Sequence, residues 1–229
     1  MKLRAIAVVP ARDEEATLPA TLASLREVPA LAEIIVVDDG SRDRTPKVAC
    51  HLGATVVSSA PSGRGGAGKG GALRVGLLHA RERRPDAFLL ADADLGSSAS
   101  RLAALLRALG TGRPAAIAAF PPAASGGLGV VKRLARRAIA RRTGWRPVEP
   151  LSGQRALLTP ALEALPGIAP GFGAEVGMTI DLLASGIRPL EIPLPLSHRP
   201  TGKSLAGFAH RARQGLDIAR ALNGARIPW

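Results

Sequence analysis

Cysteine, tyrosine and aromatic residues in general are scarce in this chain of 229 residues. It has one cysteine, Cys50, no tyrosine, and an aromatic content of 3%. A single cysteine excludes an internal disulfide framework and is typical of a reducing compartment. We expect Cys50 to be a small buried apolar residue. Few aromatic side chains leave few stacking platforms for single-stranded nucleic acid.

Long apolar runs are also absent. Ala5–Val9 and Ile34–Val37 are far too short to span a bilayer. Met1–Arg4 leads directly into a strand-like segment, without the apolar stretch and cleavage site of a signal peptide. We therefore expect a cytoplasmic protein. A chain of 229 residues with 46% hydrophobic composition predicts one domain with a single core.

Acidic residues are few relative to basic ones. The chain has 18 Asp and Glu against 31 Lys and Arg, a formal net charge of +13. This excess favours anionic partners, namely nucleic acid, a membrane surface or phosphorylated substrates. The alternative is a purely compositional origin, because the chain is rich in Ala, Arg, Gly and Pro. Both readings stay open at this point.

Apolar runs alternate with segments of helical spacing along the chain. The expected strands are Leu3–Val9, Ala32–Val37, Ala54–Val57, Ala87–Ala91, Ala115–Phe120 and Ile187–Ile192. The expected helices are Glu14–Leu25, a helix capped by Ser41 or Asp43 that runs to Leu52, Ala72–Ala80, Ser100–Leu109, Val130–Arg142, Leu157–Leu165, Ala174–Ser185 and Leu205–Leu222. Nearly continuous apolar strands between helices predict an α/β fold with a parallel sheet covered on both faces.

A glycine-rich stretch, residues 61–71, matches two nucleotide-binding patterns incompletely. Gly63, Gly65 and Gly68 fit G-x-G-x-x-G, but Pro61 intervenes and two strand–helix units already precede the stretch. Residues 63–69 fit much of a P-loop, yet Gly70 stands where the magnesium-binding Ser or Thr belongs. What remains is a set of backbone N–H groups and Lys69, which suit a diphosphate in any fold. A flexible surface loop is the alternative.

Two carboxylates, Asp92 and Asp94, follow the strand expected at Ala87–Ala91. Ligands of open α/β sheets gather at the carboxyl ends of strands, and alternation along an extended backbone points both aspartates the same way. Their oxygens suit Mg²⁺ or Mn²⁺, which also bind substrate phosphates. The alternative is a helix cap, with Asp94 serving the residues from Ser97 onward.

Further acids follow the first two strands. They are Asp13, Glu14 and Glu15 after the first strand and Asp38 and Asp39 after the second. Each is compatible with a solvated turn or a cap. Because their mutual repulsion would cost stability, we expect a cation or a hydrogen-bonded ligand at this edge.

Four motifs in this order resemble the nucleotide-sugar half of GT-A glycosyltransferases of the family 2 type. They are residues 9–15 (VPARDEE), 34–41 (IIVVDDGS), 68–70 (GKG) and 91–94 (ADAD). Residues 151–156, 171–177 and 197–200 are similar to segments of the glucosyl-3-phosphoglycerate synthases and their mannosyl relatives. The resemblance implies a single GT-A domain over residues 1–229, with a nucleotide-sugar half at 1–96. Residues 97–229 would form the acceptor half with a C-terminal helix.

The resemblance also implies roles for individual residues. Those expected to bind the nucleotide sugar are Pro10, Ala11, Arg12, Asp13, Glu14, Asp39, Lys69, Asp92, Ala93, Phe172, Gly173, Ala174 and Glu175. Asp94 and His198 would hold Mg²⁺ or Mn²⁺, and Glu175, Asp94 and Lys69 would take part in catalysis. The acceptor would be held by Gly129, Val130, Val131, Lys132 and Arg199.

Glu175 has different roles in the two stereochemical classes of enzyme. In an inverting enzyme it would be the general base for the acceptor hydroxyl, and in a retaining enzyme it would hold the sugar. The alternative is an acid in the first turn of a helix, where it is favourable to the helix dipole.

The basic helix expected at Val130–Arg142 carries six cations and an apolar stripe. The cations are Lys132, Arg133, Arg136, Arg137, Arg141 and Arg142, opposite Val131, Leu134, Ala138 and Ile139. Such a helix is compatible with a solvated face, with an anionic membrane, or with attraction of a phosphorylated acceptor.

Together these patterns predict a metal-dependent transferase that moves a sugar from a UDP- or GDP-sugar to a small anionic acceptor. Two other functions stay open. One is transfer to a polyprenyl phosphate at the membrane surface, and the other is a non-catalytic basic binding module. Paired aspartates argue against nucleic acid, because they repel phosphates unless a metal intervenes. Peripheral membrane contact and a homodimer also stay open.

Overall fold

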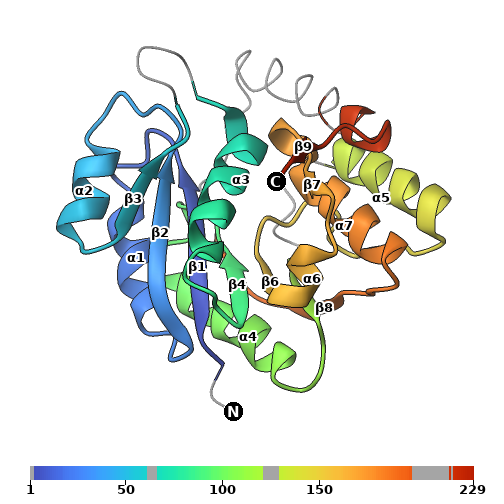
Figure 1. Cartoon of the computed structure of the whole chain (residues 1–229), viewed down its shortest axis with the longest axis horizontal. Helices are drawn as coiled ribbons and strands as arrows, with labels where there is room; N and C mark the ends of the chain where they lie inside the picture. Colours follow the sequence, from blue (N-terminus) through green and yellow to red (C-terminus); the bar gives the residue numbers. More distant parts are fainter. Residues whose placement is uncertain (1–2, 61–65, 121–128, 198–216, 218) are drawn as a thin grey trace.

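A computed structural model describes residues 3–60, 66–120, 129–197, 217 and 219–229. A seven-stranded sheet lies between two layers of helices (Figure 1). Its strands are β1 (Ala5–Ala11), β2 (Leu31–Asp38), β3 (Thr55–Ser58), β4 (Ala87–Leu90), β5 (Ala115–Ala119), β6 (Arg155–Leu158) and β8 (Leu190–Pro193). The α-helices are α1 (Leu18–Arg26), α2 (Thr45–His51), α3 (Gly68–Arg81), α4 (Ala103–Leu109), α5 (Gly129–Thr143), α6 (Thr159–Glu163) and α7 (Ala174–Ala184). Two 3₁₀-helices, η1 (Gly96–Leu102) and η3 (Gly171–Gly173), precede α4 and α7.

The sheet has the order β3-β2-β1-β4-β6-β5-β8. All neighbouring strands are parallel except β6, which runs antiparallel to both β4 and β5. The mostly parallel α/β sheet predicted from the sequence is therefore confirmed. A second, two-stranded sheet pairs β7 (Gly167–Ile168) with β9 (Ile227–Pro228) near the C-terminus.

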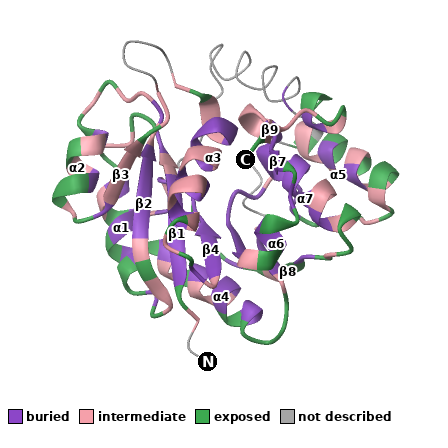
Figure 2. Ribbon diagram, in the orientation of Figure 1, coloured by how far each residue is buried: buried purple, intermediate pink, exposed green. Residues whose placement is uncertain are grey.

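Alternate residues of the central strands supply two separate cores. On β1, Ala5, Ala7 and Val9 face the layer of α1, η1 and α4, while Ile6 and Val8 face α3, α6 and α7. All five side chains are completely buried. Figure 2 shows the same pattern, with buried central strands and exposed outer faces on α2 and α5. This period of two is what a sheet covered on both sides requires.

Strand β6 was not expected from the sequence. Its four residues, Arg155–Leu158, begin with an arginine, and Leu157 and Leu158 fit a helix equally well. The observed helix there, α6, spans only Thr159–Glu163. Pairing with β4 and β5 on either side supplies the hydrogen bonds that make this short segment a strand.

Helix α3 begins at Gly68, four residues before the predicted start at Ala72. Glycine disfavours helices, which is why the sequence predicted a loop here. Tertiary packing overrides that preference, because a Cβ on Gly70 would lie 2.1 Å from the carbonyl oxygen of Ala169. Only glycine allows α3 to approach this close to the segment before η3.

One burial prediction was wrong. Cys50 is exposed, because it lies on the solvent side of α2, while Ala49 next to it is buried in the core. In the apolar stripe of α5, Ile139 is buried together with Ala135, whereas Leu134 is 57% exposed. Most of the predicted helix Leu205–Leu222 lies outside the described residues. The part of it that the structure describes, residues 217 and 219–222, is helical.

Candidate functional site

The loops that follow β1 and β2 are joined at the carboxyl edge of the sheet. The Asp13 backbone N–H donates to Ser41 Oγ (3.1 Å), and the Arg42 N–H donates to Asp13 Oδ1 (2.7 Å). The Glu14 N–H donates to Thr45 Oγ1 (2.8 Å). Asp13 has a φ of 56°, a left-handed conformation that aspartate tolerates better than most residues. The loop after β1, which is expected to bind the nucleotide sugar, is thus held in place by the loop after β2.

The acids at this edge are compensated by the protein itself. Glu15 accepts hydrogen bonds from Arg44 Nε (2.8 Å) and from the Arg44 backbone N–H (2.9 Å). These bonds lower the pKa of Glu15. Asp38 Oδ1 accepts from the Ser41 N–H (3.1 Å). The Arg44 guanidinium and backbone donors therefore offset part of the repulsion expected among these acids.

Asp39 is buried and holds the start of α3. Its Oδ1 accepts a hydrogen bond from Ser59 Oγ (2.6 Å), and the Gly68 N–H lies 3.1 Å from Oδ2 and 3.2 Å from Oδ1. A carboxylate here meets an unsatisfied donor of the first turn of the helix. Asp39 therefore fixes the segment that presents Lys69.

Lys69 forms the centre of the site. Its Nζ lies 2.7 Å from Asp92 Oδ1 and 2.8 Å from Glu175 Oε1. Burial alone would lower the pKa of Lys69, but the two carboxylates raise the pKa above its ordinary value. The lysine is therefore charged across the physiological range. It connects the end of β4, the start of α3 and the first turn of α7, which are far apart in the sequence.

Asp92 is held through both oxygens. Gln154 Nε2 donates to Asp92 Oδ2 at 2.6 Å, while Lys69 takes Oδ1. Gly153 leaves the room for this arrangement, because a Cβ there would lie 2.7 Å from Lys69 Nζ. Sequence reasoning missed Gln154 and Gly153 as functional residues, although both lie in the motif at residues 151–156 that carried the resemblance.

Arg155, the first residue of β6, supports the first turn of α7, which carries Glu175, through Thr179. Arg155 is completely buried, with Nε donating to the Ser152 carbonyl (2.9 Å) and Nη1 donating to Thr179 Oγ1 (2.9 Å). Thr179 Oγ1 donates in turn to the Glu175 carbonyl (2.9 Å). Burial lowers the pKa of Arg155 to about 10, opposed by the charges of Glu175 and Glu191. Its Nη2 has no hydrogen-bond partner among the described residues.

Asp92 and Asp94 are partly exposed while Ala93 and Leu95 are buried, but β4 ends at Leu90, so the extended backbone expected to point both aspartates the same way ends before them. Its predicted metal partner, His198, and the predicted acceptor residue Arg199 lie outside the described residues. Within the described part of the chain, no three His, Cys, Asp or Glu side chains cluster in a way that could hold a metal. Phe172 is partly buried, and Gly173 and Ala174 are buried beside Glu175.

The predicted acceptor segment begins α5. Gly129 is exposed at its start, and Val131 packs against the small core around Ala135 and Ile139. Lys132 is paired with Glu149 at 2.5 Å, and both side chains are largely buried. The cation expected to meet the acceptor is thus neutralised by an acid that the sequence did not single out.

A mostly parallel sheet with acids and a buried lysine at its carboxyl edge is the architecture of nucleotide-sugar transferases with the GT-A fold. The model of glycosyl transferase family 2 matches residues 6–164, and the chain belongs to this family. It is therefore a glycosyltransferase, and the GT-A fold inferred from sequence motifs is confirmed.

Two of the similar proteins carry names that point to different acceptors. The chain is 28% identical to an undecaprenyl-phosphate mannosyltransferase of Micrococcus luteus over 214 residues, covering 88% of this chain and 87% of the relative. It resembles solved structures of glucosyl-3-phosphoglycerate synthase from Mycobacterium tuberculosis. The structure with Mn²⁺, UDP and phosphoglyceric acid matches with a TM-score of 0.78 and 28% identity, over 98% of this chain and 80% of that one. The structure with Mg²⁺ and UDP matches with a TM-score of 0.78 and 27% identity, over 98% and 81%.

Proposed function

We propose that this glycosyltransferase moves a sugar from a UDP- or GDP-sugar to a small anionic acceptor, with the help of a divalent cation. The observation that carries the proposal is Lys69, held between Asp92 and Glu175 at the carboxyl ends of the strands. A fixed cation at this edge suits the diphosphate of a nucleotide sugar. The structures of glucosyl-3-phosphoglycerate synthase with UDP support a uridine donor.

The donor set at Asp94 fits Mg²⁺ or Mn²⁺. Asp94 offers hard oxygen ligands from a partly exposed position directly after β4 and Asp92. Mg²⁺ is commonly bound through one or two carboxylates together with waters and substrate phosphates, so a complete protein cage is not needed. We infer that Asp94 holds the ion, with His198 as second ligand. When bound, such an ion neutralises charge that develops on a departing diphosphate.

The residues around Lys69 then have distinct roles. Lys69 binds the diphosphate, and Gln154 fixes Asp92 so that one carboxylate oxygen always faces the lysine. Glu175 Oε1 already accepts a bond from Lys69, which favours a role in holding the lysine and the sugar.

Thermal unfolding with ligands tests the proposal. We expect UDP or GDP with Mn²⁺ to raise the Tm of the wild-type chain by mass action, and Asp94→Asn to abolish the part of the rise that depends on Mn²⁺. Glu82→Gln is the matched control, because Glu82 is 73% exposed next to the last turn of α3, at the opposite end from Lys69. If neither nucleotide raises the Tm with any divalent ion, the proposed donor site is wrong.

A polyprenyl phosphate is the second candidate acceptor. The outer face of α5 exposes Arg133, Arg137, Arg141 and Arg142 together with Leu134, and α5 carries no acid. Similarity to the undecaprenyl-phosphate mannosyltransferase extends over most of both chains. Among the described residues no helix is long and apolar enough to cross a membrane.

Binding of the chain to lipid vesicles distinguishes a polyprenyl phosphate acceptor from a small anionic acceptor. For a membrane-bound acceptor, the chain should sediment with vesicles of anionic phosphatidylglycerol but not with phosphatidylcholine vesicles, and Arg137→Glu with Arg141→Glu should abolish sedimentation. For a small acceptor such as a phosphorylated three-carbon acid, product should form without vesicles and the wild-type chain should not sediment.

A further inference from the structure

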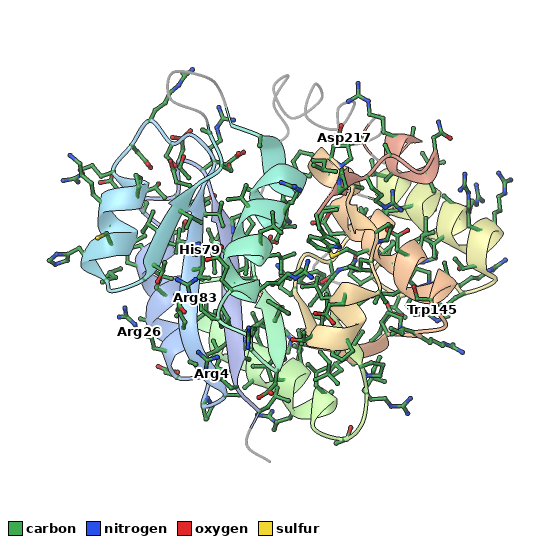
Figure 3. All side chains as sticks on the ribbon, in the orientation of Figure 1. Arg4, Arg26, His79, Arg83, Trp145 and Asp217 are labelled. Carbon is green, nitrogen blue, oxygen red and sulfur yellow. The ribbon has the colours of Figure 1, made fainter. Side chains whose placement is uncertain are left out.

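A carboxylate from the C-terminal segment lies against the turn that precedes Glu175. The backbone N–H of Phe172, in η3, donates to Asp217 Oδ2 at 3.2 Å. The Asp217 side chain is only 8% exposed. Figure 3 places Asp217 at the same end of the molecule as the start of α3, where Lys69 lies. Sequence analysis gave Asp217 no role.

The turn is shaped to receive this carboxylate. Gly171 has a φ of +55°, and a Cβ there would lie 2.1 Å from Asp217 Oδ2. A Cβ on Gly173 would lie 2.5 Å from the Asp217 carbonyl oxygen. Both positions therefore need glycine for the C-terminal segment to approach so closely. Placement of a carboxylate beside the start of α7 is also favourable to the dipole of that helix.

The other side of the turn rests on the first turn of α3. A Cβ on Gly70 would lie 2.1 Å from the Ala169 carbonyl oxygen and 3.0 Å from the Gly171 nitrogen. The turn is thus held between Asp217 and the helix that carries Lys69. A shift of the turn would change the 2.8 Å contact of Lys69 with Glu175.

Asp217 is not needed to attach the C-terminal segment. Arg226 binds Asp181 through Nε (2.5 Å) and Nη2 (2.7 Å), and Trp229 Nε1 donates to the Leu165 carbonyl (2.6 Å). Among the described residues Asp217 also contacts Arg220, at 3.4 Å, and the Arg220 side chain is 66% exposed. Because other contacts already attach the C-terminal segment, attachment alone does not explain the buried hydrogen bond between the Phe172 N–H and Asp217. We therefore assign this bond to holding the turn in place.

We propose that Asp217 is a positioning residue, which sets the turn Gly171–Gly173 and through it the spacing of Glu175 and Lys69 around the sugar and diphosphate. The inference rests on the proposed donor site. Removing the carboxylate frees the Phe172 N–H and loosens the turn. Donor binding then weakens because Glu175 no longer meets Lys69 in one fixed geometry.

Amide hydrogen exchange and nucleotide binding test this role together. In the full chain without ligand, Asp217→Ala should speed exchange of a peptide spanning residues 169–176 about tenfold and weaken binding of UDP or GDP with Mn²⁺ about tenfold. Asp217→Asn keeps an acceptor oxygen, so it should retain most of the slow exchange of residues 169–176 and most of the nucleotide binding. Arg220→Ala, the matched control, should change neither. Gly171→Ala, which crowds Asp217 from the other side, should speed the same exchange.

The two proposals fail in different ways. Wild-type exchange and wild-type nucleotide binding in Asp217→Ala would refute the positioning role, and so would faster exchange spread evenly over the whole chain. If the wild-type chain binds neither nucleotide with Mn²⁺, the proposed donor site is wrong. In that case amide hydrogen exchange of residues 169–176, compared between Asp217→Ala and wild type, still decides whether Asp217 holds the turn.

Discussion

At the scale of single residues, the site depends on glycines as much as on charges. Gly153 leaves room for Lys69 and Asp92, Gly70 for the Ala169 carbonyl, and Gly171 for Asp217. Each lets two segments approach more closely than a Cβ would allow. The charged residues Asp92, Lys69 and Glu175 were predicted from motifs, but the glycine at 153 carries no visible signal of its role.

Gly153→Ala tests this dependence. The added Cβ would lie 2.7 Å from Lys69 Nζ and 2.8 Å from Asp92 Oδ1, so the ion pair must shift. We expect binding of UDP or GDP with Mn²⁺ to fall at least tenfold by calorimetry, while the free energy of unfolding falls by about 1 to 3 kcal/mol, the usual cost of adding a carbon to a packed site. Gly110→Ala is the control, because Gly110 ends α4 with a φ of −62° and a Cβ there meets only Arg107 O at 3.2 Å. Unchanged nucleotide binding in Gly153→Ala would contradict the assigned role of Lys69.

At the scale of elements, polar groups join strands to helices away from the site. Glu33 on β2 accepts from Thr55 Oγ1 on β3 (2.7 Å) and from Arg83 Nε just after α3 (2.6 Å). Burial alone would raise the pKa of Glu33, but the bonds from Thr55 and Arg83 hold the pKa below its ordinary value. In Figure 3, Arg83 and His79 lie close together at this end of α3. The cluster fixes the end of α3 opposite Lys69.

The lowered pKa of Glu33 gives a pH dependence with a definite sign. Its stabilising contribution is complete above the unfolded-state pKa of about 4.3 and is lost as pH falls through the folded-state value. Glu33→Gln should therefore lower the free energy of unfolding by about 1 kcal/mol at pH 7. The difference from wild type should shrink as urea unfolding is repeated down to pH 3.5. Glu27→Gln, an exposed acid just after α1, is the control. A difference that is the same at both pH values would show that ionisation of Glu33 does not matter.

At the scale of the whole molecule, one sheet joins the two halves predicted by resemblance. β4 belongs to residues 1–96, yet it pairs with β6 from the second half, which in turn pairs with β5. The core around Phe88 and Leu90 is completed by Leu157 and Ala161. The boundary near residue 96 therefore lies within one continuous sheet, and we predict that both halves form a single domain.

Cooperative unfolding tests the single domain. Both tryptophans, Trp145 and Trp229, lie in the second half, so their fluorescence reports on that half alone. Far-UV circular dichroism reports on helices and strands of both halves. In urea, we expect the two signals to give one coincident transition. Two separated midpoints would show that residues 1–96 and 97–229 unfold independently, which would refute the single-domain prediction.

The sequence by itself determined the class of fold and the family, and it predicted the carboxyl edge of the sheet as the site. Buried strands, helical periods and motifs such as 91–94 are local patterns, and local patterns can be read from a chain. Only the tertiary structure decided that β6 inserts antiparallel, that Gln154 and Arg155 support Asp92 and Glu175, that Lys132 is paired with Glu149, and that Asp217 holds the turn. The side-chain contacts among these join residues 17 to 62 positions apart, and their geometry depends on how whole elements pack. No spacing along the chain encodes that packing.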